Sequence, residues 1–262
     1  MAAETSTRAA PDAAAVGGLY CYGVTWAKVG PPDRTGVGGE AVGVVADGEL
    51  AALTSAVAST SIKAKRRDLL NHSEVLAAAL ERGTVLPLRF GVVFEDETAL
   101  VDEFLRPRRE ELEGLLRQFE GRVELTVRAT FDEQAILAEV VTENPRIARL
   151  REETRHGDGA ATYPLKVELG ELVAAELRKR TARDQRALLD RLGRLALDFQ
   201  VDEEPIENQV LRASFLVERG KVSAFDDAME ELAREHAGRI RFKYVGPLAP
   251  HSFVSVGTPG AG

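Results

Sequence analysis

The chain opens with segments whose apolar residues follow strand patterns. Leu19–Trp26 is rich in aromatic and β-branched residues, which favours a β-strand. A polar loop rich in Gly and Pro follows at residues 30–39, and Ala41–Ala46 predicts a second, short strand. Asp47-Gly48 comes directly after this strand and is typical of a hairpin turn. The N-terminal region is therefore predicted to contain a β-sheet.

A strongly apolar segment farther along predicts another strand. Val85–Phe94 contains nine uncharged residues and a single charge, Arg89, and Pro87 places the strand at a sheet edge or at a bulge. A charge inside such a strand needs either a buried partner or an exit to solvent. Arg89 is therefore either an arginine at the edge of the sheet or a functional residue.

Two helices are predicted around this strand. Asn71 with Glu74 three residues later resembles a capping box, which predicts a helix over His72–Glu81 that ends at Gly83. The second helix opens with three acidic residues at 95–97, which suit the positive end of a helix dipole. Its apolar stripe has helical spacing and consists of Leu100, Val101, Phe104, Leu105, Leu112, Leu115, Leu116 and Phe119.

Proline and glycine interrupt the second helix and end it. Pro107 must kink or restart the helix, and Gly121 stops it. Val123–Ala129 then alternates between apolar and polar residues, as a strand does. This strand closes a predicted N-terminal α+β domain over residues 18–131.

The remaining chain is predicted to form a second domain over residues 132–262. Residues 132–200 read as helix, broken at Asn144-Pro145, with a polar loop at His156–Gly159 and a long helix from Leu165 or Gly170 to Phe199. A strand, helix and strand follow at Val210–Val217, Ser223–His236 and Ile240–Val245, with Ser223 as the cap of the helix. The fold class is therefore α+β with two domains and a largely helical middle segment.

Composition limits the possible partners. The chain has 262 residues, 44% of them hydrophobic, and a formal net charge of −8, which argues against nucleic acid as the main partner. Residues 1–17 read as a flexible tail without the apolar segment of a secretory signal, and no stretch reaches the ~18 apolar residues of a membrane span. We therefore expect a soluble, cytoplasmic protein that binds neither nucleic acid nor membrane.

The residues that carry most enzyme chemistry are not arranged as a catalytic or metal site. The single cysteine, Cys21, lies in an apolar run and is expected to be a buried core residue. Gly36–Gly39 lacks the Lys-Ser/Thr ending of a phosphate-binding loop and is expected to be a mobile loop. The histidines show no zinc-binding spacing; they are His72, His156, His236 and His251. We expect no catalytic residue, metal or cofactor.

Four motifs, in order along the chain, resemble those of one family. Leu86–Phe94 reads Leu-Pro-Leu-Arg-Phe-Gly-Val-Val-Phe and resembles the LPxRFGxxF signature of the GvpF/GvpL gas vesicle proteins. His72–Leu76 resembles the H-x-x-V-L helix of that family, and Leu19–Val24 resembles its first strand. Gly246–Val254 resembles its closing GPxPPYSFV motif, with Ala249 and His251 in place of a proline and the tyrosine.

The resemblance implies a specific fold and function. The C-terminal portion is expected to be ferredoxin-like and to end in a tail. The function implied is that of a non-enzymatic minor or accessory protein of gas vesicles, which binds the small hydrophobic shell protein GvpA, limits its aggregation, and assists nucleation and assembly of the shell. Other gas vesicle accessory proteins are further expected partners. The candidate partner-binding residues lie in two of the motifs and are Arg89, Phe90, Phe94, Pro247, Pro250 and Phe253.

One alternative from another functional class remains open. A ferredoxin-like regulatory module that binds a small metabolite would have the same rhythm of strands and helices, with the glycine-rich loop as its contact. An enzyme is the third hypothesis, and it requires an acid/base pair that converges in a pocket.

Overall fold

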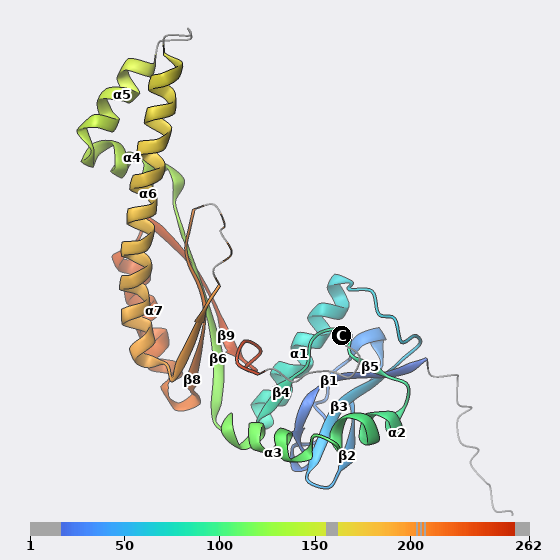
Figure 1. The fold of residues 1–262 in the computed structure, drawn as a ribbon. Coiled ribbons are helices and arrows are strands. Elements are labelled where there is room, and N and C mark those ends of the chain that lie inside the picture. The colour runs from blue at the N-terminus through green and yellow to red at the C-terminus, as the bar shows by residue number, and fades with distance from the viewer. Residues whose placement is uncertain (1–16, 156–161, 203, 205, 207, 255–262) are drawn as a thin grey trace, which may run out of the picture. The chain divides into compact units, whose positions relative to one another are not determined.

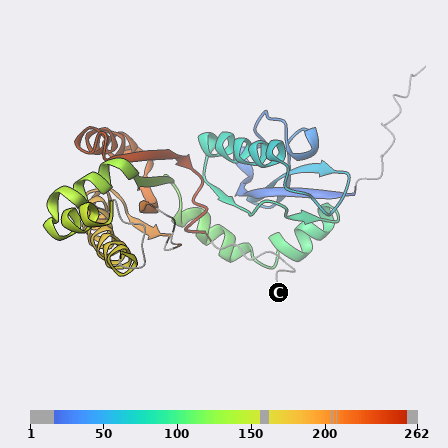
Figure 2. The same ribbon diagram turned by 90° about the horizontal axis from the view of Figure 1, so that it is seen from above.

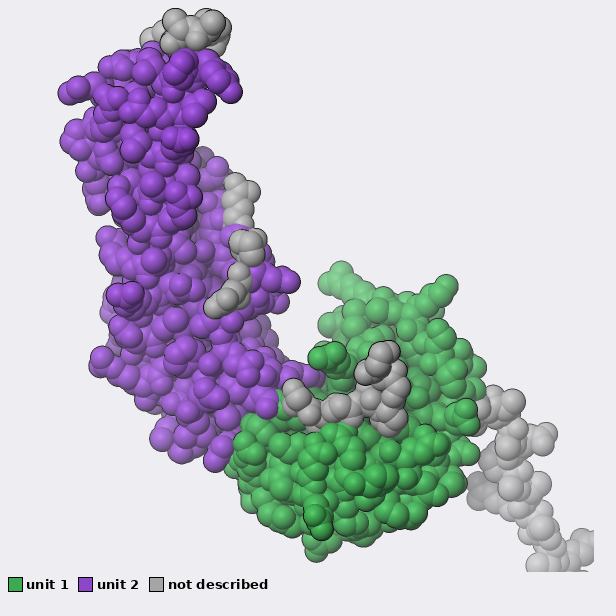
Figure 3. Space-filling model, viewed as in Figure 1, with its two compact units in different colours: residues 1–120, 254–262 green, residues 121–253 purple. Residues whose placement is uncertain are grey.

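The chain folds into two compact units. The structure is a computed structural model that describes residues 17–155, 162–202, 204, 206 and 208–254. One unit contains residues 1–120 and 254–262, and the other contains residues 121–253 (Figure 3). The predicted tail at 1–17, except Gly17, and the predicted polar loop at 156–159 lie outside the described residues.

The first unit, unit 1, is built on an antiparallel sheet. Its strands are β1 (Gly18–Trp26), β2 (Gly43–Asp47), β3 (Leu50–Val57), β4 (Val85–Pro87) and β5 (Val93–Phe94). The strand order is β2-β3-β1-β4, and β5 also pairs with β1. The predicted strands at β1 and β2 and the turn at Asp47-Gly48 are confirmed, with Gly48 at φ +64°.

The predicted single strand over 85–94 is wrong. β4 and β5 both pair with β1, and a turn at Phe90-Gly91 separates them, with Gly91 at φ +96°. Glycine adopts this left-handed backbone without the steric penalty that a Cβ brings. Because the turn lifts the chain out of the sheet, Arg89 reaches solvent and needs no buried partner.

Helices lie on both faces of this sheet. Figure 2 shows the sheet between α1 (Arg66–Arg82) on one face and the segment of α2 and α3 on the other. α1 ends before Gly83 as predicted, but it begins at Arg66, so the predicted start at His72 is wrong. Asn71 lies inside the helix, and its side chain donates to the carbonyl of Gly36 instead of capping.

The acidic helix breaks near Pro107, as predicted. It consists of α2 (Glu97–Ala99), capped by the side chain of Asp96, a π-helical segment η3 (Leu100–Leu105), and α3 (Arg109–Gln118). The predicted apolar stripe faces the core, where Leu100, Phe104 and Leu112 are fully buried. Short 3-10 turns complete the chain's elements and are η1 (Ala27–Val29), η2 (Val37–Gly39), η4 (Gly193–Leu195) and η5 (Arg219–Lys221).

The second unit, unit 2, has the ferredoxin-like topology. Its elements in chain order are β6 (Arg122–Phe131), α4 (Glu133–Glu143), α5 (Pro145–Arg155), α6 (Tyr163–Leu192), β7 (Asp198–Val201), β8 (Gln209–Glu218), α7 (Val222–Glu235) and β9 (Ile240–Leu248). The sheet is antiparallel with strand order β7-β8-β6-β9. A β-α-β-β-α-β sequence in this order is the ferredoxin-like arrangement.

The compact units divide before β6, whereas the sequence places the domain division after it. β6 pairs with β8 on one side and with β9 on the other, so it is a central strand of the sheet in unit 2. These pairings join residues 79 to 124 positions apart, and no local pattern reveals them. The α+β class, the two-domain organisation and the helical middle are confirmed.

The predicted helix boundaries in unit 2 are partly wrong. α6 ends at Leu192, and residues 198–201 form β7 instead of continuing the helix to Phe199. Phe199 pairs in register with Phe215 of β8, and their rings lie 5.9 Å apart, so sheet contacts override the helical pattern. α7 begins at Val222, which places Ser223 inside the helix without a capping hydrogen bond.

The core of unit 2 lies between the sheet and two helices. Figure 1 shows α6 and α7 on the same face of the sheet. Alternate residues of β6 and β8 point to these helices and are buried, together with apolar residues of α6 and α7. The largest contributors are Leu125, Phe131, Leu188, Leu192, Leu211, Phe215, Phe225 and Met229.

An ion-pair network fixes α4 on α6. Arg180, whose side chain is 7% exposed, contacts Glu139 at 3.0 Å, Glu143 at 2.6 Å and Glu176 at 2.9 Å. Arg239, next to the start of β9, contacts Glu139 at 2.6 Å. The hydrogen bond from Arg239 lowers the pKa of Glu139 below its ordinary value, although partial burial opposes this. Removing Glu139 would therefore take one of its carboxylate partners from each of the two arginines, while Arg180 keeps Glu143 and Glu176.

Candidate functional site

Two motif residues of β1 and α1 form a buried polar contact in unit 1. Tyr20 is fully buried and His72 is 5% exposed. The Tyr20 hydroxyl lies 2.8 Å from Nδ1 of His72 and accepts a hydrogen bond from the backbone N–H of Gly91 at 3.1 Å. Burial raises the pKa of Tyr20 above its ordinary value, so the phenol keeps its proton and is able to donate it to His72. The contact joins the first strand, the helix and the turn.

A second buried tyrosine holds the glycine-rich loop. The Tyr22 hydroxyl accepts a hydrogen bond from the N–H of Val37 at 2.6 Å and lies 2.7 Å from the Ser55 hydroxyl. Asn71 donates to the carbonyl of Gly36 at 2.9 Å. This loop is therefore attached to both the sheet and α1.

Three of the four amides of the loop, those of Gly36, Val37 and Gly39, donate to groups within the protein. The N–H of Gly36 donates to the carbonyl of Glu40 at 2.7 Å, and the N–H of Gly39 donates to the carbonyl of Gly36 at 3.2 Å. Phosphate recognition by a glycine-rich loop requires amides that point at the ligand. With these amides engaged, the loop does not present the set of free N–H groups that phosphate binding requires.

Aromatic contacts connect the turn at Arg89 to the same cluster. The ring centroids of Phe90 lie 5.8 Å from those of Tyr20 and of His72. Phe90 is half-buried, while Arg89 is exposed beside it. The cluster thus fixes the backbone of the turn and leaves the arginine free to contact a partner.

Phe94 belongs to the core of unit 1. It is 7% exposed, and its ring centroid lies 5.5 Å from that of Phe104. It therefore has little surface to offer a partner and acts mainly by positioning the end of the motif.

The closing motif is held by a buried carboxylate of the sheet in unit 2. Glu124 of β6 is 3% exposed. Its Oε2 accepts from the N–H of Ser252 at 2.7 Å, and its Oε1 accepts from the Ser252 hydroxyl at 2.8 Å. Ser214 of β8 lies 2.9 Å from the same hydroxyl. These bonds satisfy a carboxylate that would otherwise be expensive to bury.

The predicted residues of this motif divide into exposed and buried positions. Pro247 is exposed, Phe253 is half-buried and Pro250 is buried. The structure thus brings Arg89 and Phe90 together in unit 1 and separates Pro247, Pro250 and Phe253 into another segment of the chain.

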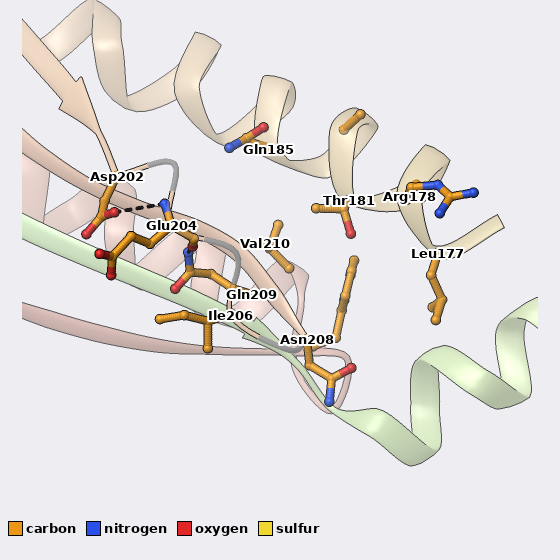
Figure 4. Close-up of a pocket in the computed structure, with 12 residues that line it drawn as sticks. Leu177, Arg178, Thr181, Gln185, Asp202, Glu204, Ile206, Asn208, Gln209 and Val210 are labelled. Carbon is orange, nitrogen blue, oxygen red and sulfur yellow. Dashed lines mark hydrogen bonds between the residues drawn. The ribbon is translucent and has the colours of Figure 1, made fainter. Parts of the chain in front are cut away.

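A cavity of about 510 Å³ lies between α6 and the segment that joins β7 to β8 (Figure 4). Leu177, Thr181 and Gln185 line it from α6, and Asn208 and Gln209 line the opposite side (Figure 4). The described lining also includes the charged residues Arg178, Asp202 and Glu204, and it contains no histidine, cysteine or serine. This composition suits binding through amides and hydroxyls and offers no nucleophile with a paired base.

Titratable groups elsewhere give no metal or thiol site within the described residues. No three His, Cys, Asp or Glu side chains in this part of the chain are grouped so as to hold a metal ion. Cys21 is buried, as predicted, and burial raises its pKa to about 12. The thiol therefore stays protonated and unreactive at neutral pH. No helix of the described chain is long and apolar enough to cross a bilayer.

Sequence reasoning missed the residues that organise both motif segments. Tyr20 and Tyr22 are two residues apart, which places both side chains on one face of a strand, and this spacing was the available signal. Glu124 gave no such signal, because its role depends on Ser252, which lies 128 residues away.

Comparisons with known proteins point to one family. A family model described as "Gas vesicle synthesis protein GvpL/GvpF" matches residues 18–255. Gas vesicle protein F of a Streptomyces species is 36% identical over 239 residues, which cover 90% of this chain and 98% of the relative. Gas vesicle protein F of a Nostoc species is 28% identical over 196 residues, covering 74% of this chain and 79% of the relative.

Solved structures have the same fold. The crystal structure of gas vesicle protein GvpF from an Anabaena species gives a TM-score of 0.77 at 25% identity, covering 92% of this chain and all of that one. GvpF from Microcystis aeruginosa gives a TM-score of 0.71 at 23% identity, covering 90% of this chain and 98% of that one.

Proposed function

The chain belongs to the GvpL/GvpF family of gas vesicle synthesis proteins, and we propose from this premise that it binds the small hydrophobic shell protein GvpA. In doing so it limits the aggregation of that protein and assists nucleation and assembly of the shell. The family consists of gas vesicle accessory proteins and not of enzymes. The observation that carries the proposal is the match over residues 18–255, which includes all four motifs.

The chemistry of the chain suits this role. A net charge of −8 keeps a protein soluble while it carries an apolar subunit. The contact that we propose is the turn of Arg89 and Phe90, because it combines an exposed cation with a half-buried aromatic ring on a fixed backbone. Phe94 and Pro250 are buried, and we assign them the role of holding the backbone of their motifs. Pro247 and Phe253 form a second proposed contact with the shell protein.

Co-expression with the shell protein tests the proposal. The soluble fraction of the shell protein is measured by sedimentation, with and without this chain. We expect more soluble shell protein with the wild-type chain and a smaller gain with Arg89→Ala. Arg34→Ala, another exposed arginine in unit 1, is the matched control and should behave as wild type. An equal soluble fraction with and without the chain contradicts the function, and an unaffected Arg89→Ala variant contradicts only the contact.

The cavity of Figure 4 favours a second candidate function, a regulatory module that binds a small metabolite. It lies in the ferredoxin-like unit and has a size suited to a small molecule. A thermal-shift screen of polar metabolites tests this function. A rise in Tm that disappears in a Gln185→Leu variant supports it, and no response to any compound argues against it.

A further inference from the structure

In the described part of the chain, α6 and α7 lie on one face of the sheet of unit 2, and no helix lies on the other face. Leu125, Val127 and Ala129 of β6 point into the core beneath α6 and α7, so Arg128 between them points to the opposite face. The same alternation places Arg212 of β8 on that face, and Arg241 and Lys243 of β9 as well. We call these four residues the basic sheet face: Arg128, Arg212, Arg241 and Lys243.

The strand register places like charges directly opposite one another. Arg128 pairs with Arg212 on one side and with Lys243 on the other, and Arg241 stands one position along on β9, opposite Thr130. Directly opposed side chains have Cβ atoms about 5 Å apart, and like charges in such pairs are destabilising. Three cations thus form a row across three neighbouring strands.

Few carboxylates of the described chain compensate these charges. Asp202 pairs with Arg212 at 3.1 Å. Glu124 lies on the same face but is engaged by Ser252. Arg128, Arg241 and Lys243 have no ion pair among the described residues, although the chain has 42 acidic residues against 34 basic ones.

Elsewhere in unit 2, some basic residues meet acidic partners, whereas others, such as Arg149, Arg151 and Arg186, have no ion pair among the described residues. Arg146, Arg191 and Arg239 each form ion pairs with glutamates. What distinguishes the row on the sheet is that its cations stand directly opposite one another in register, with only Arg212 in an ion pair among the described residues. A like-charge row that weakens the sheet is readily explained when its counter-charges come from another molecule.

We propose that the basic sheet face docks an extended, acidic segment of a partner protein. Arg241 and Lys243 are two residues apart on one strand, about 7 Å, which is also the repeat of alternate side chains in an extended peptide. Carboxylates at alternate positions of the segment would therefore meet successive cations, while the hydroxyls of Thr126 and Thr130 on the same face are available to its polar groups. A protein segment fits better than nucleic acid, because the net charge of −8 repels a polyanion outside the patch.

A labelled peptide of alternating Glu and Thr is the probe, with the full chain as receptor and fluorescence anisotropy as the readout. Binding is measured at physiological ionic strength, where exposed charges interact over about 8 Å. The variant Arg128→Gln/Arg241→Gln/Lys243→Gln should bind on the order of tenfold more weakly, since three ion pairs with the peptide are lost. Its Tm should be equal to or higher than that of wild type, because the repulsion between strands is removed.

The matched control is Arg149→Gln/Arg151→Gln/Arg186→Gln. These three arginines are exposed on α5 and α6, so the change in net charge is the same away from the sheet. The control should bind the peptide as wild type does. Equal weakening in both variants, or no binding by wild type, overturns the proposal.

Two further probes test the kind of partner. A peptide of the same composition with its glutamates grouped at one end should bind more weakly, and equal binding contradicts the alternate spacing. A single-stranded DNA oligonucleotide of equal charge should also bind more weakly; tighter binding by DNA overturns the assignment to a protein segment. The outcome is separate from the test of the shell-protein function, because no probe contains shell-protein sequence.

Discussion

Replacing Tyr22 with phenylalanine removes a single oxygen from the centre of unit 1. That oxygen accepts from the N–H of Val37 at 2.6 Å and contacts the Ser55 hydroxyl at 2.7 Å. Val37 is 1% exposed and Ser55 is 3% exposed, so water has little access to the groups left behind. The ring itself stays in place, and the substitution therefore isolates the hydrogen bonds from the packing.

The expected loss follows from these two partners. A buried polar group that loses its partner costs about 1–3 kcal/mol. The buried Val37 N–H loses its acceptor and is expected to incur the full cost. The Ser55 hydroxyl is able to rotate, so only part of its hydrogen bonding is lost. We therefore expect unit 1 to lose about 2–4 kcal/mol of unfolding free energy and its Tm to fall on the order of 10 °C.

Urea unfolding followed by tryptophan fluorescence measures this loss in the correct unit. Trp26, at the end of β1, is the only tryptophan of the sequence and reports on unit 1. Ser61→Ala is the control within unit 1, because Ser61 is exposed, and it should change stability by less than about 0.5 kcal/mol. A Tyr22→Phe variant as stable as this control would refute the reasoning. In addition, Tyr22→Phe with Ser55→Ala should cost less than the sum of the two single changes.

Three further tests, which use four substitutions, examine other parts of the structure. The hydrogen bond from Arg239 lowers the pKa of Glu139 in the folded protein. The stability that this bond contributes is therefore complete above the unfolded pKa of ~4.3 and is lost as the pH falls through the lower folded pKa. Urea unfolding followed by circular dichroism should show Glu139→Gln less stable than wild type by about 1–2 kcal/mol at pH 7, and the stability of the variant should depend less on pH below pH ~5. Ser252→Ala removes the hydroxyl that is bound to Glu124, so limited proteolysis should cut the chain faster after Leu248. An unchanged rate of cleavage contradicts the idea that Glu124 holds the closing motif through Ser252. Gly91→Ala should cost about 1–2 kcal/mol at φ +96°, whereas Gly114→Ala in α3 should stabilise the protein by about 0.5–1 kcal/mol; a neutral Gly91→Ala contradicts the strain.

Elements defined by local signals were predictable. The turn at Asp47-Gly48, the end of α1 at Gly83 and the break at Asn144-Pro145 depend on backbone preferences of glycine, aspartate and proline, and all three are confirmed. Helix starts were less predictable. Asn71 and Ser223 have the residue types of caps, but these types also occur inside helices when their side chains find other contacts or solvent.

The candidate site was predictable only as a set of motifs. The sequence places Arg89 in an apolar segment, but it does not reveal the turn that exposes Arg89 or the ring contacts that fix Phe90. The contact of buried Glu124 with Ser252 depends on how distant segments pair in the sheet, and so does the row of cations that includes Arg128. Pairing between distant strands is a property of the assembled sheet, because hydrogen bonds and cross-strand contacts form only after the chain has closed long loops.

The sequence by itself determined the α+β class, most of the strands and helices, and the family, because each of these is carried by residues that are close together or by motifs in fixed order. Tertiary structure decided the rest. β6 belongs to the sheet of unit 2, and the residues predicted as the end of a helix form β7. Tyr20, His72 and Gly91 meet in one hydrogen-bonded contact. The physical reason is common to all three: burial and pairing between distant segments outweigh local preferences that differ by less than about 1 kcal/mol per residue.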